Sequence, residues 1–90
     1  MISITYHAIE QFQRRGGSPD PGKAQAKLEK MLAQSYPAEK NNQYWSLLNN
    51  GGKVATYHLY NNWVMVEVDC KMVTCYQDSP ARYTPKKYAA

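Results

Sequence analysis

A change of hydrophobic period divides the chain and constrains its fold more than any other feature. Apolar residues recur at helical spacing in the first part, whereas they alternate with polar residues from residue 44 to residue 76. Short runs that suit tight turns interrupt the alternation at residues 49–52, 61–62 and 69–71. Because short turns join antiparallel neighbours, we expect an α+β fold with two N-terminal helices packed on one face of a roughly four-stranded antiparallel meander sheet.

Two helices are expected before the strands. Thr5 suits the N-cap of a short helix over residues 6–15, in which apolar side chains recur at helical spacing. Asp20, followed by a proline at the first helical position, is a strong start for a second helix over about residues 21–35. The Tyr36-Pro37 pair stops this helix, because proline cannot continue the hydrogen-bond ladder.

The strands follow a polar loop over residues 38–43, and a short extended segment precedes the first helix. The predicted strands cover residues 44–48, 53–60, 63–68 and 72–76. Residues 1–77 are expected to form a single domain, since 90 residues support one modest core. Residues 78–90 contain two prolines and no period, which predicts an irregular C-terminal tail.

Composition excludes several classes of protein. No run approaches the ~20 apolar residues of a membrane span, and the first residues lack a signal-peptide pattern, so we expect a cytoplasmic protein that does not bind a membrane. Cys70 and Cys75 are too few for a disulfide framework and are expected to be free thiols. The sequence has no cluster of side chains at the spacing of metal ligands, so neither a metal nor another cofactor is expected. Eleven basic against seven acidic residues give a net charge of +4, which permits a nucleic-acid partner.

The two-residue turn at 61–62 fixes the register of the central hairpin, with Tyr60 opposite Trp63. One face of the hairpin is apolar, and we expect the second helix to cover it; it consists of Ala55, Tyr57, Leu59, Val64, Val66 and Val68. The other face is expected to be open, and it consists of Thr56, His58, Tyr60, Trp63, Met65 and Glu67.

A turn at residues 70–71 would place Thr74 and Tyr76 on this open face, opposite Glu67 and Met65. The face then gathers a carboxylate, an imidazole and hydroxyl groups, which suits proton transfer, although an ordinary solvated sheet face has the same composition. A three-residue turn would shift the last strand by one residue and hide both hydroxyl groups. We prefer the first register because it buries a valine and leaves the hydroxyl groups exposed.

His7, Gln11 and Arg15 form one stripe of the first helix, with Arg14 beside it. An imidazole beside two guanidinium groups suits phosphate chemistry, because arginine binds phosphate oxygens as a planar fork and histidine exchanges a proton near neutral pH. The alternative is that both arginines only stabilise the helix C-terminus through its dipole.

Two motifs resemble those of a known family. Residues 7–15, HAIEQFQRR, and residues 72–76, MVTCY, are similar to the "H-A-x-x-R-x-x-x-R" start and the "V-V-T-V-Y" end of small bacterial and phage proteins grouped with RelE-like and barnase-like nuclease toxins. The order of elements is also similar, from residue 2 to about residue 77. Gln11 stands where the pattern has its first arginine, so Arg14 would have to substitute for that arginine.

The resemblance implies a metal-independent endoribonuclease of toxin type that cleaves RNA and is neutralised by a cognate antitoxin or immunity protein. In such cleavage the ribose 2′-oxygen attacks the adjacent phosphorus while a base and an acid move protons. The catalytic candidates are His7, Arg15, Thr74 and Tyr76, from the motifs, and His58 and Glu67, from the sheet register. The substrate-binding candidates are Arg14, Tyr60 and Trp63, whose aromatic rings would stack unpaired bases.

Two other functions are consistent with the same residues. The departure at Gln11 and the modest charge favour a catalytically inactive phage or mobile-element module that binds and inhibits a host nucleic-acid enzyme. The aromatic sheet face or the tail would instead suit a protein–protein adaptor.

Overall fold

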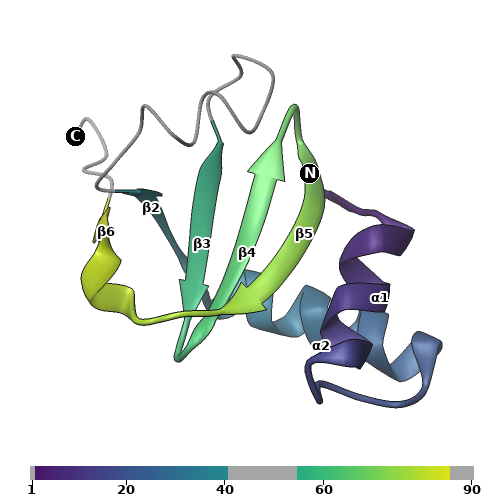
Figure 1. Ribbon diagram of the computed structural model, residues 1–90. Helices are drawn as coiled ribbons and strands as arrows, with labels where there is room; N and C mark the ends of the chain where they lie inside the picture. Colours follow the sequence, from purple (N-terminus) through teal and green to yellow (C-terminus); the bar gives the residue numbers. More distant parts are fainter. Residues whose placement is uncertain (1, 41–54, 86–90) are drawn as a thin grey trace.

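A computed structural model describes residues 2–40 and 55–85 of the chain. In chain order the elements are β1 (Ser3–Ile4), α1 (Tyr6–Arg14), α2 (Pro21–Gln34), β2 (Tyr36–Lys40), β3 (Thr56–Tyr60), β4 (Trp63–Val68), β5 (Lys71–Gln77), the 3₁₀ helix η1 (Pro80–Arg82) and β6 (Tyr83–Pro85) (Figure 1). Neither helix in these two ranges is long and apolar enough to cross a membrane.

The prediction of a four-stranded antiparallel meander sheet is wrong. Over residues 2–40 and 55–85 the sheet has six strands in the order β1-β5-β4-β3-β2-β6, and it is mixed because β1 pairs with β5 in parallel. The α+β class and two helices agree with the expectation. The predicted strand at 44–48 and the turn at 49–52 lie outside the described residues.

Strands β2 and β6 arise from segments that were expected to be irregular. Tyr36 precedes a proline, which favours extended backbone, and the chain continues as β2 with Ala38 fully buried. Pro37 is tolerated because β6 pairs only with residues from Ala38 onward, which leaves Pro37 on a locally open edge. Tyr83 begins β6 and is also buried, so the tail contributes a strand where an irregular segment was expected.

Both helices begin as predicted. The Thr5 hydroxyl accepts a hydrogen bond from Ala8 N, and an Asp20 carboxylate oxygen accepts one from Lys23 N, so both residues act as N-caps. α1 ends near Gly16, whose φ of +82° lies in the left-handed region that glycine adopts without strain.

The helices cover the face of the sheet that was expected to be open. One core lies between the helices and this face, and it contains Ala8, Ile9, Phe12, Ala24, Leu28, Met31, Met65, Met72 and Cys75, with Tyr60 and Trp63 packed against it. A second core lies on the opposite face, and it contains Ala38, Ala55, Tyr57, Leu59, Val64, Val66 and Tyr83. The prediction was wrong because it counted the rings of Tyr60 and Trp63 as polar surface, whereas aromatic rings carry large apolar areas that favour burial.

The register of β5 also differs from the prediction. The turn lies at Asp69 and Cys70, both with positive φ, one residue earlier than expected. Val73 of β5 is then an extra residue between the Val66–Thr74 and Glu67–Met72 pairs, and this bulge shifts the pairing. As a result Thr74 lies opposite Val66, and Tyr76 opposite Val64, instead of opposite Glu67 and Met65. The side chains of Thr74 and Tyr76 therefore belong to the face away from the helices.

Candidate functional site

The sheet divides the predicted catalytic residues into two groups. His58 and Glu67 belong to the face on which the helices pack, whereas Thr74 and Tyr76 belong to the opposite face. Within residues 2–40 and 55–85, no hydrogen bond or ion pair links His7 or Arg15 to Thr74 or Tyr76. The structure therefore does not assemble the predicted site from its two motifs through direct contacts.

The basic groups of α1 lie on its exposed side. His7, Arg14 and Arg15 are exposed, whereas Ala8 and Phe12 pack into the core. Arg14 Nη2 contacts Glu10 Oε1 at 2.8 Å, in a pair whose two side chains are more than half exposed. Such exposed pairs contribute little stability, but the glutamate partly neutralises the charge that Arg14 would need in order to replace the arginine missing at position 11.

His58 and Glu67 are in direct contact across β3 and β4. The distance between His58 Nε2 and Glu67 Oε1 is 2.6 Å, and the side chains retain 14% and 21% of their exposure. The contact is diagonal, since His58 lies opposite Met65 and Glu67 opposite Thr56. The neutral tautomer of His58 that fits a carboxylate at this distance has its hydrogen on Nε2, where it is donated to Glu67, and has Nδ1 as the acceptor. The carboxylate thereby orients an imidazole that can take part in acid–base chemistry.

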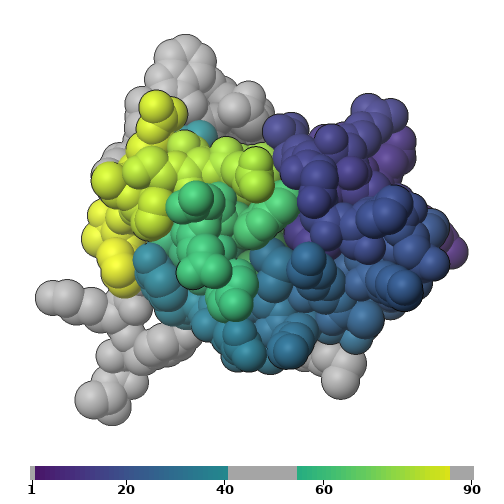
Figure 2. All heavy atoms as spheres, turned by 90° about the horizontal axis from the view of Figure 1, so that it is seen from below, coloured from purple at the N-terminus to yellow at the C-terminus, as the bar shows by residue number. Residues whose placement is uncertain are grey.

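A cavity of about 300 Å³ lies between α2 and the β3–β4 turn. Figure 2 shows this turn, in green, against the C-terminal part of α2, in blue-teal. The cavity is lined by aromatic, amide and lysine side chains and one methionine, and these are Lys27, Lys30, Met31, Gln34, Tyr60, Asn61 and Trp63. No carboxylate is among these described residues, so both of their charged groups are cationic.

The Trp63 ring is supported from behind. Its centroid lies 4.7 Å from that of Phe12, with the two planes tilted by 54°. Phe12 is fully buried, and its ring packs against Gly17. A Cβ atom added at Gly17 would lie only 2.5 Å from the Phe12 ring. This packing restrains the indole orientation, so a ring that stacked on it would cost less side-chain entropy.

The two lysines of the cavity differ in their contacts. Lys27 Nζ donates a hydrogen bond of 3.2 Å to the carbonyl oxygen of Gly17, so its position is fixed near the cavity. Lys30 makes no hydrogen bond or ion pair within the described ranges and is exposed. Neither lysine was predicted from the sequence as part of a site. The four α2 residues that line the cavity nevertheless share one helical stripe, at positions 27, 30, 31 and 34. This stripe indicates a cavity wall only once the sheet face that α2 covers is known.

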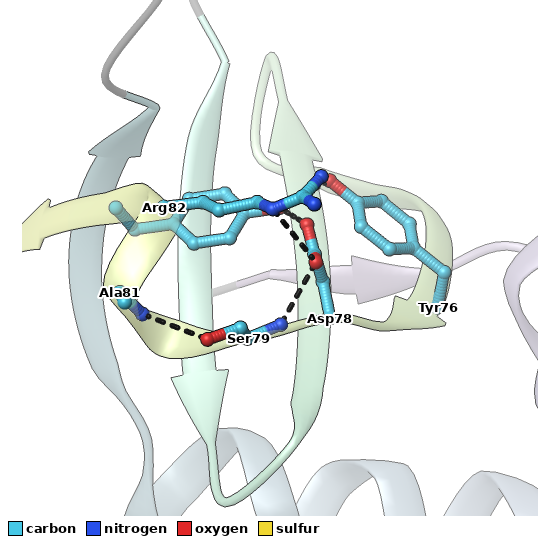
Figure 3. Close-up of polar contacts among 6 residues, drawn as sticks. Tyr76, Asp78, Ser79, Ala81 and Arg82 are labelled. Atoms are coloured by element: carbon cyan, nitrogen blue, oxygen red, sulfur yellow. Dashed lines mark hydrogen bonds and ion pairs between the residues drawn. The ribbon is translucent and has the colours of Figure 1, made fainter.

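Tyr76 belongs to a separate polar network that holds the C-terminal segment against β5 (Figure 3). Its hydroxyl group lies 2.8 Å from that of Tyr83, which donates to Asp78 Oδ2 at 2.9 Å. Asp78 Oδ1 also accepts a hydrogen bond from Ser79 N and faces Arg82 Nε at 3.7 Å. These contacts attach η1 and β6 to the end of β5.

The same network determines how its groups ionise. Burial raises the pKa of Tyr76, and burial together with the Tyr76 and Asp78 hydrogen bonds raises the pKa of Tyr83. Desolvation acts to raise the pKa of Asp78, but hydrogen bonds and nearby cations outweigh it and hold that pKa below its usual value. Tyr76 therefore stays protonated with its hydroxyl engaged, which fits a structural role better than proton abstraction.

The cysteines and metal-binding groups add no further site. Cys70 and Cys75 are free thiols, as predicted, and Cys75 is buried with its Sγ 3.3 Å from the Ala8 carbonyl oxygen. Over residues 2–40 and 55–85, no group of three or more histidine, cysteine, aspartate and glutamate side chains could hold a metal ion.

Comparison of the chain with family models, curated proteins and solved structures gave no match.

Proposed function

We propose that the protein binds single-stranded RNA at the cavity between α2 and the β3–β4 turn. One unpaired base stacks on the supported Trp63 ring beside Tyr60, and the adjacent phosphates approach Lys27 and Lys30. The observation that carries the proposal is the combination of two aromatic side chains and two lysines around one cavity of about 300 Å³. Stacking platforms beside cationic side chains are typical of proteins that bind single strands.

The size and charge of the site agree with this ligand. The cavity is at the lower limit of the about 300–1,000 Å³ found for small-molecule sites, so it suits one nucleoside unit rather than a folded RNA. The net charge of +4 also favours an anionic partner. Stacking contributes ~1–3 kcal/mol per base, and each phosphate contact adds an attraction that weakens with salt.

The experiment is a fluorescence anisotropy titration of a labelled oligouridylate of about eight nucleotides, a length within the range covered by single-strand binding domains. Lys30→Ala should weaken binding and lower the slope of log affinity against log salt by about 0.7. The matched control is Lys71→Ala, which removes the same charge from an exposed residue at the opposite end of β5 from the cavity. Equal effects of the two variants would contradict the proposed site.

A second pair of variants tests the stacking. Tyr60→Leu keeps an apolar side chain in a half-buried position but removes the aromatic ring, and it should weaken binding about tenfold if the ring stacks a base. Tyr6→Leu makes the same exchange at a tyrosine that is 90% exposed on α1, and it should leave the affinity unchanged. If the wild-type protein binds no oligonucleotide at about 50 mM salt, where phosphate contacts are strongest, the proposal is wrong.

RNA cleavage is a second candidate, and the His58–Glu67 contact favours it. His58 and Tyr60 occupy alternate positions of β3, so both belong to the face that carries the cavity. A strand with one base in the cavity would thus bring a neighbouring ribose towards the imidazole. His58 Nδ1 would take the 2′ proton, the 2′-oxygen would attack phosphorus to form a 2′,3′-cyclic phosphate, and the imidazolium would return the proton to the departing 5′-oxygen.

Cleavage is tested by incubating the protein with RNA in the presence of a chelator and analysing the product ends. His58→Gln keeps a hydrogen bond to Glu67 but removes the proton acceptor, so it should abolish the cyclic phosphate without lowering affinity. Cleavage would support a cytoplasmic toxin with a cognate antitoxin, and expression should then arrest growth. Binding without cleavage would instead support an inactive module that competes with a nucleic-acid enzyme, and absence of both would favour a protein–protein adaptor.

A further inference from the structure

A second cavity, more open to solvent than the first, lies on the other side of the β3–β4 turn. It has a volume of about 390 Å³ and is lined by Asn62, Gln77, Asp78, Ser79 and Pro80. The turn separates it from the cavity between α2 and the β3–β4 turn, since Asn61 lines one cavity and Asn62, the next residue, lines the other. The two cavities are therefore neighbours across a single tight turn.

A cross-strand pair also joins the two cavities. Trp63 of β4 lies directly opposite Gln77 of β5, so the two side chains extend from the same face of the sheet. Trp63 lines the first cavity and Gln77 the second. Directly opposed residues of an antiparallel pair have Cβ atoms about 4.5–5.5 Å apart, so the Gln77 amide lies close to the base expected to stack on Trp63.

The position of the second cavity is fixed by the backbone and by the network shown in Figure 3. Asp78 N donates a hydrogen bond of 2.9 Å to the carbonyl oxygen of Asn62, which ties the turn to the end of β5. Asp78 is held in turn by Ser79 and Tyr83. Within the described part of the chain, the side-chain amides of Asn62 and Gln77 have no hydrogen-bond partner and are exposed. Their donors and acceptors are thus available to a ligand.

The charges around the turn give a bound strand a direction. Among the described residues, lysines line only the first cavity, and the one ionised group that lines the second is the Asp78 carboxylate, whose pKa is lowered. A phosphate is attracted to the first cavity, whereas the second presents it with the Asp78 carboxylate, whose charge Arg82 at 3.7 Å partly neutralises. An uncharged base edge suits the second, and one with an exocyclic amino group suits it best, because that group donates to an amide or carboxylate oxygen.

From this arrangement we propose that the second cavity is a base-reading subsite for the nucleotide next to the stacked one, and that Gln77 there selects adenine over uracil. The proposal rests on the function proposed above, and it adds the sequence preference of the same site. The Gln77 amide accepts from the adenine N6 amino group and donates to a ring nitrogen of the same base. Asn62 offers a second amide on the same wall.

The test compares two labelled oligonucleotides of equal length, an oligouridylate and an alternating adenosine–uridine strand. Wild-type protein should bind the alternating strand about fivefold more tightly, in the lower range of discrimination by a paired amide. Part of that preference comes from the better stacking of adenine on Trp63. The decisive measurement is therefore the change in the ratio of the two affinities when Gln77 is replaced.

Gln77→Ala should lower this ratio at least threefold. Gln13→Ala is the matched control, since it removes an amide from α1 that contacts only Pro19 in the described structure, and it should leave the ratio unchanged. Gln77 is exposed, so the variant is expected to fold, and a thermal melt verifies this.

The outcomes separate the two proposals. A wild-type ratio near one, or a ratio that Gln77→Ala leaves unchanged while Lys30→Ala still weakens binding, would overturn the base-reading subsite and retain the RNA-binding function. Failure of the wild-type protein to bind either strand would overturn the function itself. A selective loss in Gln77→Ala supports both.

Discussion

The packing of Gly17 against Phe12 leads to a prediction that connects stability with the candidate site. A Cβ atom at position 17 would lie 2.5 Å from two atoms of the Phe12 ring, far inside van der Waals contact. Phe12 is fully buried and packs against the Trp63 ring, so a shift of its ring disturbs this contact. Gly17→Ala must therefore displace the Phe12 ring or the backbone after α1.

Overpacking of this kind costs about 1–3 kcal/mol in a close-packed core. For a domain of this size, a loss of 2 kcal/mol corresponds to a decrease in Tm of about 8–16 °C. The free energy of unfolding is measured by urea denaturation, in which a lower midpoint at constant slope identifies a change in stability. Because Trp63 is moved together with Phe12, the same variant should bind oligouridylate more weakly at a temperature where it is still folded.

Two other glycines serve as controls. Gly16 has a φ of +82° and open space around its Cα, so Gly16→Ala should cost about 1–2 kcal/mol through backbone strain alone, with the RNA affinity unchanged. Gly22 lies in the first turn of α2, where Gly22→Ala should change stability by less than about 1 kcal/mol. A Gly17→Ala protein as stable as wild type would refute the packing described between α1 and β4.

Three further predictions concern the polar network and the thiols. Tyr83→Phe removes two hydrogen bonds and should cost about 1–3 kcal/mol in a urea titration, whereas Tyr76→Phe, which removes one, should cost less. The pKa of Asp78 is lowered on folding, so its contribution to the free energy of unfolding is present above its unfolded pKa of about 3.9 and is lost as the pH falls through the folded value. Asp78→Asn should therefore lose less stability than wild type on acidification below about pH 4. An equal acid dependence of the two proteins would contradict this. Burial raises the pKa of Cys75 to about 11. A thiol reagent at neutral pH should therefore modify only the exposed Cys70 in the native protein, and both thiols after unfolding. Rapid modification of two thiols in the native protein would show that Cys75 is accessible.

Features set by local chemistry could be predicted from the sequence. The N-caps at Thr5 and Asp20 each depend on a side chain within three residues of its partner, and both are confirmed. The β3–β4 register followed from the two-residue turn at Asn61, whose φ is positive, as such turns require. The same register placed His58 and Glu67 on one face, and the structure confirms that they meet there.

Features set by long-range packing could not be predicted in this way. The bulge that turns Thr74 and Tyr76 towards the second core leaves no trace in the alternating pattern, because a single extra residue is enough to invert a strand. The pairing of β2 with both β3 and β6 depends on contacts between distant segments. The cavity with Lys27 and Lys30 could be predicted only if the sheet face that α2 covers were known. The wrong face was expected because the tyrosine and tryptophan rings were counted as polar surface.

The parallel pairing of β1 with β5 has a consequence for how the chain folds. Thr5 donates a hydrogen bond to the Met72 carbonyl oxygen, 67 positions along the chain, and α1 packs its apolar residues against the same strand. Closing so long a loop is slow, because its entropy must be lost before the contacts form. During synthesis, α1 can pack on α2 early, but the part of its buried face that contacts β5 has no partner until that strand emerges from the ribosome.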